Sequence, residues 1–430
     1  MKSKFIKSTI ILIIGGFITK ILGMVIKIAL TRVISTKGIG LYMLILPTFN
    51  LFITLCTLGL PTAISKLVSE NKRRSKKIVL SIVPVVIIFN FMLMILLFFV
   101  SPFISKYLLK NTLTFYPLIC ISFTLPFICI SSIIKGYFFG KERMFPYTLS
   151  NIIEQLVRLF LTIFYIPNLL KYSLTITICG VVLINIISEF ISILTLLLFL
   201  PKKEVIYKKD FSFDKNIIKD MLNISIPTTT TRLIGSLSYF LEPIILTFCL
   251  IKLGYNNNYI TLEYGIINGY VYPLLLLPSF FTMAISNALL PVVSKNYVRQ
   301  NYSYINKKVK QAIIFSLLIG IPCTFVFIFV PNILLNFIYN TNLGINYIKV
   351  IAPFFLLHYI QSPLTIVLQA IDKASCAMRG TFIGCIIKLI LLFILTMLNI
   401  GMWGLIISSI VNIIYVTLHH VYYVVKYLKR

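Results

Sequence analysis

The sequence contains few acidic residues and few charged residues of any kind. Asp and Glu number 11 against 40 Lys and Arg in 430 residues, and charged residues make up 12% of the chain. Hydrophobic residues reach 59%. This balance excludes a soluble globular protein, because such a chain could not cover its surface with polar groups. We therefore expect most of the chain to be solvated by lipid.

Motifs that carry reaction chemistry are missing as well. The sequence has no CxxC, Walker motif, HExxH or nucleophile elbow, and its eight cysteines lie mostly within apolar runs. We predict that the protein is not an enzyme, holds no metal or cofactor, and does not itself pump with ATP. The longest polar stretch, residues 201–220, is too short for a soluble domain, which argues against a membrane enzyme with a catalytic ectodomain.

Apolar segments of spanning length are what the sequence does contain. Each is about 20 residues long, enough to cross a bilayer as a helix. The twelve segments lie near 8–31, 40–62, 78–101, 113–134, 146–166, 174–200, 221–250, 264–291, 310–331, 347–370, 379–398 and 401–425. The sequence therefore predicts an all-α integral membrane protein with twelve transmembrane helices.

The basic residues indicate how these helices are oriented. If the N-terminus is cytoplasmic and the helices alternate, 28 of the 40 Lys and Arg residues fall in cytoplasmic segments and seven in external ones. This is the bias that the positive-inside rule describes, and it accounts for the basic excess without a nucleic-acid partner. We predict a multi-pass protein of the cell membrane with both termini in the cytoplasm.

Corresponding features recur along the chain at a nearly constant interval. Pro61 and Pro291 are 230 residues apart, and Pro102 and Pro331 are 229 apart. An even number of spans separates the two copies, so we predict two six-helix repeats of the same orientation. The predicted organisation is an N-terminal bundle, residues 1–200, a cytoplasmic linker, 201–220, and a C-terminal bundle, 221–430.

Two lysines lie inside the first apolar segment. Lys20 and Lys27 are seven residues apart, close to two helical turns, and therefore project from the same helix face. A cation at this depth is costly unless it faces a watery cavity or a partner. We favour a cavity; the other interpretation is that the lysines reach an interface or pair with a buried acid.

The repeat suggests which residues share that cavity. Thr19-Lys-Ile-Leu-Gly23 recurs as Thr231-Arg-Leu-Ile-Gly235, which maps Lys20 onto Arg232 and Lys27 onto Tyr239. We predict an anion pocket between the halves, formed by Lys20, Lys27, Arg232, Thr231 and Tyr239, for a phosphate-like group. Pro227 suggests unwinding beside the pocket, although the hydroxyls of residues 228–231 could equally bond back to their own helix.

Other charges within the apolar segments have a structural interpretation. Glu154 and Arg158 stand at i, i+4, so we favour a structural ion pair and keep a role in coupling as the alternative. Glu242 precedes a proline. It either marks a helix break or supplies a counter-ion to Arg232.

Several motifs resemble those of a known family. They are Ile18-Thr-Lys20-Ile-Leu-Gly23, Gly38-Ile-Gly-Leu-Tyr42, Gly59-Leu-Pro61-Thr-Ala-Ile-Ser65-Lys66, Lys135-Gly-Tyr-Phe-Phe-Gly140 and Ile153-Glu-Gln-Leu-Val-Arg158. They are similar to the stage V sporulation protein B branch of the polysaccharide and lipid II flippases, within the MATE-like exporter superfamily.

The resemblance implies two six-helix bundles around a V-shaped, alternating-access cavity. It also implies an undecaprenyl-diphosphate-linked saccharide as the substrate, with Lys20 and Lys27 at the diphosphate. Many of these flippases have fourteen helices, two more than we predict here.

Two alternatives to the flippase remain at this stage. One is a cation-coupled drug or metabolite antiporter of the same superfamily, which would need a membrane-embedded acid such as Glu154, Glu189 or Glu242. The other is a scaffold that does not transport and that belongs to a complex of cell-wall synthesis proteins. In each case the partners include membrane lipids.

Overall fold

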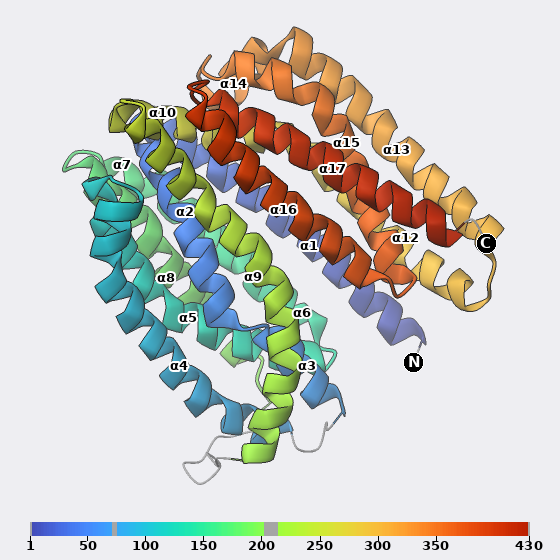
Figure 1. Ribbon diagram of the computed structural model, residues 1–430. Helices are drawn as coiled ribbons and strands as arrows, with labels where there is room; N and C mark the ends of the chain where they lie inside the picture. Colours follow the sequence, from blue (N-terminus) through green and yellow to red (C-terminus); the bar gives the residue numbers. More distant parts are fainter. Residues whose placement is uncertain (1, 71–74, 202–213, 429–430) are drawn as a thin grey trace. The chain divides into compact units, whose positions relative to one another are not determined.

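The computed structural model describes residues 2–70, 75–201 and 214–428, with side chains described from Ile11 onward except at positions 13, 227 and 231. Every regular element in those ranges is a helix (Figure 1), which confirms the all-α prediction. The chain divides into two compact units, Met1–Phe240 and Leu241–Arg430. The domain boundaries expected from the sequence, on either side of residues 201–220, remain a prediction.

The first unit is built mainly from long helices. They are α1 (Lys2–Val33), α2 (Thr36–Thr57), α3 (Leu60–Glu70), α4 (Ser75–Phe103), the π-helical turn η2 (Ile104–Leu108), the 3₁₀ turn η3 (Thr112–Thr114), α5 (Phe115–Gly140), α6 (Met144–Phe164), α7 (Ile166–Leu169), α8 (Leu174–Leu198) and the start of α9 (Lys215–Lys252). Several of these helices begin at a residue whose side chain caps the first turn. Ser173 Oγ, for example, accepts from the backbone N–H of Ile176 at 3.2 Å at the start of α8.

Helix α5 lies at the centre of the first unit. It packs against α2, α3, α4 and α8, and Figure 1 shows α4, α5 and α8 side by side. A Cβ at Gly140 would lie 2.7 Å from the carbonyl oxygen of Ser65, and one at Gly136 would lie 3.0 Å from Cα of Pro61. These two glycines of the Lys135-Gly-Tyr-Phe-Phe-Gly140 motif therefore permit the close approach of α5 to α3.

Two boundaries in this unit differ from those predicted. The segment expected at 40–62 is interrupted at Leu58 and Gly59, which have φ angles of 42° and 63°, and α3 then continues to Glu70. The segment expected at 113–134 continues as α5 to Gly140. Lys135 therefore lies within a helix and not, as the predicted end of this segment at residue 134 implied, in the loop that follows it.

The second unit contains the end of α9 and the remaining helices. They are α10 (Asn257–Ile266), the π-helical turn η6 (Ile267–Val271), α11 (Tyr272–Leu275), α12 (Ser279–Val298), α13 (Tyr302–Phe329), α14 (Pro331–Tyr339), α15 (Ile345–Ala370), α16 (Ala374–Met397) and α17 (Trp403–Leu428). Helix α15 packs against α12, α13, α16 and α17. Val293, Leu364 and Val367 belong to the buried hydrophobic cluster that joins these helices.

The helix positions follow the interval found in the sequence. Helices α5, α6 and α8 begin at residues 115, 144 and 174, whereas α15, α16 and α17 begin at 345, 374 and 403. Helices α5, α6 and α8 thus form a trio that matches α15, α16 and α17 one to one, and the first helix of each trio is the central helix of its unit. This spacing supports the internal repeat, and the predicted common orientation of the two copies remains a prediction.

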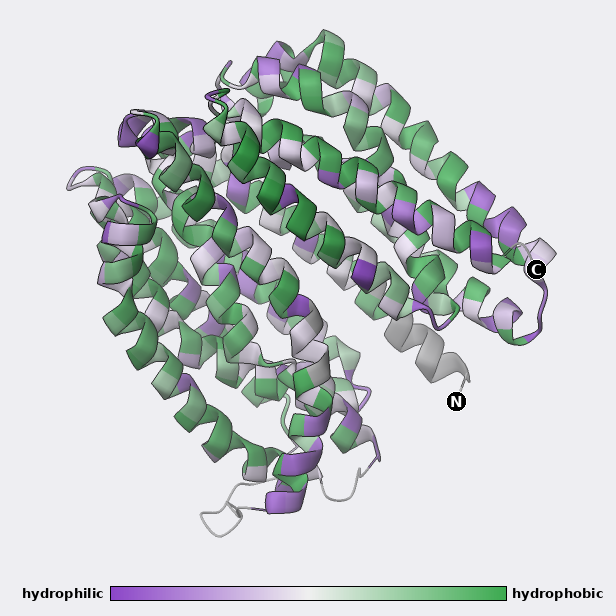
Figure 2. Cartoon of the chain, in the orientation of Figure 1, coloured by the Kyte–Doolittle hydropathy of each residue, from purple (hydrophilic) through white to green (hydrophobic). Residues whose placement is uncertain are grey.

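The outward surfaces of the helices fit a lipid environment. Large apolar side chains such as Met92 on α4 and Leu318 on α13 are each 64% exposed. Figure 2 shows hydrophobic residues along most of the helix lengths. In the described ranges, eleven helices are long and apolar enough to cross a membrane, or up to twelve when the pair bent by 51°, Asn257–Leu275 and Ser279–Val298, counts as one span.

Candidate functional site

A buried cluster of charges joins three helices of the first unit. Glu154 of α6 accepts hydrogen bonds from Lys135 Nζ of α5 and Arg158 Nη2 of α6, each at 2.9 Å. Lys135 Nζ also lies 3.7 Å from Oε2 of Glu189 on α8, and Arg158 Nη2 lies 3.4 Å from Oγ of Ser188. The side chain of Glu154 is only 8% exposed. The two acids and two cations therefore neutralise one another away from solvent.

The cluster includes the contact expected from sequence and adds two members that we did not predict there. Glu154 and Arg158 pair as their i, i+4 spacing predicts. Lys135 and Glu189 come from other helices, so their contact depends on tertiary packing. Lys135 directly precedes Gly136, and the close packing of α5 at that glycine helps to fix where the lysine side chain enters the bundle.

A small polar pocket lies next to this cluster. Its volume is about 230 Å³, and it is bounded by residues of α1, α2, α6 and α8. The polar residues in its wall are Lys27, Tyr42, Gln155, Arg158, Thr162 and Asn185. Of these residues, only Lys27 was predicted from the sequence to line a pocket. Gln155 and Tyr42 belong to motifs noted in the sequence, so the motifs were informative although no role was assigned to these two positions.

The pocket carries an excess of positive charge. Lys27 forms no ion pair or hydrogen bond with any residue in the described ranges, whereas Arg158 is shared with Glu154. The Nε atom of Arg158 is buried and has no hydrogen-bond partner among the described residues. No acid is among the lining residues. Lys27 and the guanidinium of Arg158 thus place two positive charges at the pocket, one of which is shared with Glu154.

The other residues predicted for the anion pocket lie elsewhere. Lys20 is exposed on α1 and does not line this pocket. Arg232 is exposed on α9, and Tyr239 is half-buried on the same helix. The side chain of Thr231 lies outside the described residues. The structure therefore brings Lys27 to Arg158, and a pocket that includes Lys20, Arg232, Thr231 and Tyr239 remains a prediction.

Three threonines before Arg232, at positions 228–230, bond to their own helix. Thr228 Oγ1 donates to the Ile224 carbonyl at 3.0 Å, and Thr229 Oγ1 donates to the Ser225 carbonyl at 2.7 Å. Thr230 makes the same type of bond. Helix α9 continues from Lys215 to Lys252, so the unwinding that we expected near position 227 is not present. Back-bonding is the interpretation that fits these hydroxyls.

Glu242 has a partner within the second unit. Its carboxylate forms a salt bridge with Lys388 of α16 and accepts a hydrogen bond from Tyr264 Oη of α10 at 3.3 Å. Helix α9 does not break at Glu242, and the carboxylate is 3% exposed. The helix-break interpretation is therefore wrong. The salt bridge with Lys388 supplies a structural role that the sequence did not reveal, because the two residues are 146 positions apart.

Two family models match the sequence. The model described as polysaccharide biosynthesis protein matches residues 5–297, and the MatE model matches residues 268–394. The chain is also 35% identical to stage V sporulation protein B of Bacillus subtilis over 431 residues, which cover 97% of this chain and 83% of that protein. These matches confirm the resemblance that the motifs indicated.

Solved structures share the fold at low identity. An inward-facing multidrug resistance MATE family transporter of the MOP superfamily has a TM-score of 0.75 and 16% identity, covering 96% of this chain and 94% of that one. The lipid II flippase MurJ in an inward closed conformation has a TM-score of 0.72 and 18% identity, covering 96% and 86%. The chain thus belongs to the polysaccharide biosynthesis protein family, together with stage V sporulation protein B, and is a multi-pass membrane protein with a MATE-like fold.

Proposed function

We propose that this protein is a flippase that moves an undecaprenyl-diphosphate-linked saccharide from the inner to the outer leaflet by alternating access. Family membership and the fold shared with a lipid II flippase support a transporter of this class. The observation that carries the proposal is the pocket that Lys27 and Arg158 both line and that has no acid among its lining residues. A diphosphate is the part of such a substrate that needs these groups.

The chemistry of the pocket suits a phosphate oxygen. Lys27 supplies a point charge, and the guanidinium of Arg158 adds a second positive charge, although its Nη2 atom is bonded to Glu154. Gln155 and Asn185 add side-chain amides, and Tyr42 adds a hydroxyl. Charge-assisted hydrogen bonds from such groups contribute about 1.5–3 kcal/mol each. The pocket therefore favours an anion over a neutral or cationic solute.

The size of the pocket limits what enters it. Pockets that enclose drug-sized ligands measure roughly 300–1,000 Å³, whereas this one measures about 230 Å³. In our proposal it holds only the charged group, and the saccharide and lipid tail lie outside it. Lys20, Arg232, Thr231 and Tyr239 would extend the positive path along which the diphosphate crosses the membrane.

The proposed function includes an orientation of the chain in the membrane. We propose that both termini are cytoplasmic, on the same side of the membrane as residues 201–220, and that transport proceeds by alternating access. Membrane lipids are necessary partners of this cycle, and cell-wall synthesis proteins would supply or consume the substrate. Nothing in the proposal requires a resident metal or cofactor.

A flipping assay in proteoliposomes tests the proposal. Lys27→Ala should weaken binding of a fluorescent undecaprenyl-diphosphate saccharide by about 1–3 kcal/mol and slow its flipping, while the protein keeps its thermal stability because no ion pair is broken. Arg158→Lys should retain part of the activity, since the charge stays and the planar donor geometry is lost.

Lys349→Ala is the matched control, because Lys349 is an exposed lysine on α15 and is absent from the pocket wall. Flipping by Lys27→Ala at the rate of the unaltered protein would contradict the proposal. Transport of cationic drugs without flipping would favour the antiporter, and folded protein with neither activity would favour the scaffold.

A further inference from the structure

A second pocket lies at one end of the second unit. Its volume is about 450 Å³, and its walls come from three places in the chain. Helix α10 contributes Glu263 and Ile266, the segment 342–347 contributes the end of a loop and the first turn of α15, and α17 contributes its first residue, Trp403. None of these residues belongs to the anion pocket of the first unit.

An aromatic pair and a carboxylate form the centre of this pocket. The rings of Tyr347 and Trp403 meet edge to face, with centroids 5.0 Å apart and planes at 63°. Tyr347 Oη donates to Glu263 Oε2 at 2.7 Å, which fixes the carboxylate and leaves Oε1 available. Within the described ranges, Glu263 has no cationic partner, and the indole N–H of Trp403 makes no hydrogen bond.

The loop before α15 holds two amide side chains at the same pocket. Asn340 and Gly344 have φ angles of 55° and 89°, so the backbone turns sharply on both sides of Asn342. A Cβ at Gly344 would lie only 2.7 Å from Cγ2 of Val271, which shows that the loop is pressed against η6. Asn342 and Asn346 are exposed pocket residues on either side of this fixed glycine.

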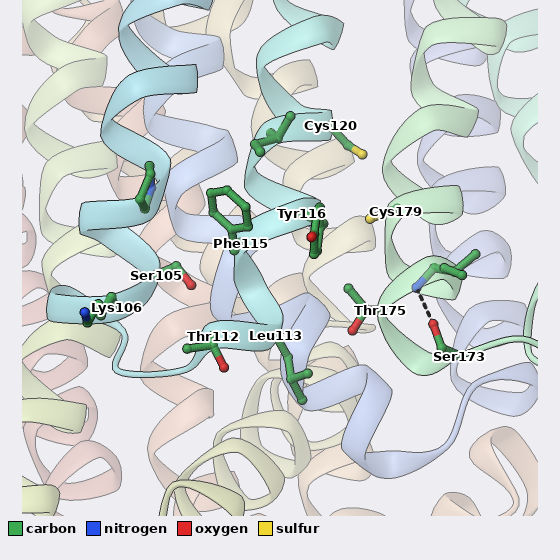
Figure 3. Close-up of a pocket in the computed structure, with 13 residues that line it drawn as sticks. Ser105, Lys106, Thr112, Leu113, Phe115, Tyr116, Cys120, Ser173, Thr175 and Cys179 are labelled. Carbon is green, nitrogen blue, oxygen red and sulfur yellow. Dashed lines mark hydrogen bonds between the residues drawn. The ribbon is translucent and has the colours of Figure 1, made fainter.

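The corresponding end of the first unit has a different chemistry. There a pocket of about 900 Å³ is bounded by the segment before α5 and the start of α8, the counterparts of the α15 and α17 positions. Figure 3 shows Leu113, Phe115 and Tyr116 around it, with Lys106 at one side. Acids and side-chain amides are absent from its lining residues. The matched loops thus give a mainly apolar pocket in one unit and a polar aromatic pocket in the other.

A role as an aromatic anchor at the membrane interface would account for Trp403 but not for the other residues of the pocket. Tryptophan and tyrosine are common at that depth, where their apolar surface meets lipid and their polar atoms meet water. That role does not require a carboxylate held by the tyrosine, nor two amides on a fixed loop. Lipid contact would also leave the charge of Glu263 with only the Tyr347 hydroxyl to stabilise it, which is costly.

We propose that this pocket binds a saccharide. The apolar C–H face of a sugar ring packs against the rings of Trp403 and Tyr347, and the sugar hydroxyls bond to Glu263, Asn342 and Asn346. A volume of about 450 Å³ falls within the range of small-ligand sites. The inference rests on the proposed function, because it assigns the pocket to the saccharide part of the lipid-linked substrate at the end of the unit predicted to be external.

The single tryptophan makes this pocket directly observable. The chain contains one Trp, so the intrinsic indole fluorescence of the purified, full-length protein reports on Trp403 alone. Titration with N,N′-diacetylchitobiose, a neutral disaccharide, should change that emission saturably. A Kd near 1 mM would approach saturation at about 10 mM ligand, tenfold above it.

Variants that retain Trp403 separate this site from non-specific effects. Glu263→Gln should raise the Kd about tenfold, and Asn342→Ala should raise it several-fold. Glu70→Gln, which removes an exposed acid of the first unit, should leave the Kd unchanged. Mannitol, which has hydroxyls but no ring face, should leave the emission unchanged over the same range.

No saturable change with the disaccharide would overturn the inference, and so would an equal response in Glu263→Gln and the unaltered protein. The readout does not depend on flipping. If the protein flips the lipid in proteoliposomes and the Trp403 emission does not change with the disaccharide, the saccharide site is wrong and the proposed flippase function is retained. If the Trp403 emission changes saturably and the protein does not flip the lipid, the saccharide site is retained and the proposed flippase function is wrong.

Discussion

The matched helix trios of the two units are held together by different polar networks. In the first unit, α5, α6 and α8 share the charges of Lys135, Glu154 and Glu189. In the second unit, α15, α16 and α17 share neutral groups: Thr365 Oγ1 lies 3.2 Å from His420 Nδ1, and His420 Nε2 lies 3.2 Å from the Ala377 carbonyl. Gln361 Nε2 of α15 adds a 2.8 Å bond to Thr417 Oγ1 of α17.

The difference is visible residue by residue at the 230-residue interval. Lys135 corresponds to Thr365 and Glu154 to Gly384, while Arg158 corresponds to another cation, Lys388. The acid for Lys388 comes from α9 instead of from its own helix. Buried charges cost desolvation that a neutral network avoids. Because neutral groups join α15, α16 and α17 to one another, charges between the helices of a trio are not needed for packing alone.

The largest effect is expected where a buried cation depends on one acid. Glu242→Gln should leave Lys388 without an ionised partner and lower the free energy of unfolding by about 3–5 kcal/mol, the cost of breaking a buried pair. SDS titration of the protein in mixed micelles measures this change.

The double variant Glu242→Gln, Lys388→Met provides the control, because it removes both charges and should recover most of the lost stability. A single variant as stable as the unaltered protein would mean that Lys388 is already well solvated. Burial of the charge would then not explain why the two units respond differently to the loss of an acid.

A smaller loss is expected in the first unit, where a second acid remains. Glu154→Gln should lower the free energy of unfolding by about 2 kcal/mol, below the range for an isolated pair, because Glu189 still lies near Lys135. The same titration tests this, with Glu70→Gln as an exposed control.

Adding Arg158→Gln to Glu154→Gln should restore part of the stability, since the surplus cation is removed. A loss for Glu154→Gln equal to that for Glu242→Gln would show that Glu189 does not compensate. A variant of normal stability that fails to flip lipid would instead give Glu154 a part in transport.

The sequence predicted what local spacing determines. The helical segments, the repeat interval and the Glu154–Arg158 pair all depend on residues within one helix or on a regular offset. Lys27 was singled out by its seven-residue spacing from Lys20 within an apolar run, and its role in binding an anion remains a prediction. These features need no knowledge of how the helices pack.

Contacts between helices were the part that sequence could not give. Lys135 stands one residue beyond the run predicted at 113–134, so the sequence suggested a residue in a loop. In the structure α5 continues past it to Gly140. Glu242 and Lys388 lie on helices far apart in the sequence. Charge type and spacing alone did not select these partners, because many pairings were compatible with the same apolar segments.

The smallest effect is expected in the neutral network of the second unit. His420 Nε2 must donate to the Ala377 carbonyl, so Nδ1 of a neutral ring accepts, and it shares the single Thr365 hydroxyl proton with the Gln361 carbonyl, which lies 2.8 Å from Thr365 Oγ1. Thr365→Val keeps the shape of the side chain and leaves Nδ1 without this bond, which should cost about 1 kcal/mol. Thr365→Ser retains the hydroxyl and should cost less in the same SDS titration. A loss for Thr365→Val as large as that for Glu154→Gln would remove the distinction between a charged trio and a neutral one.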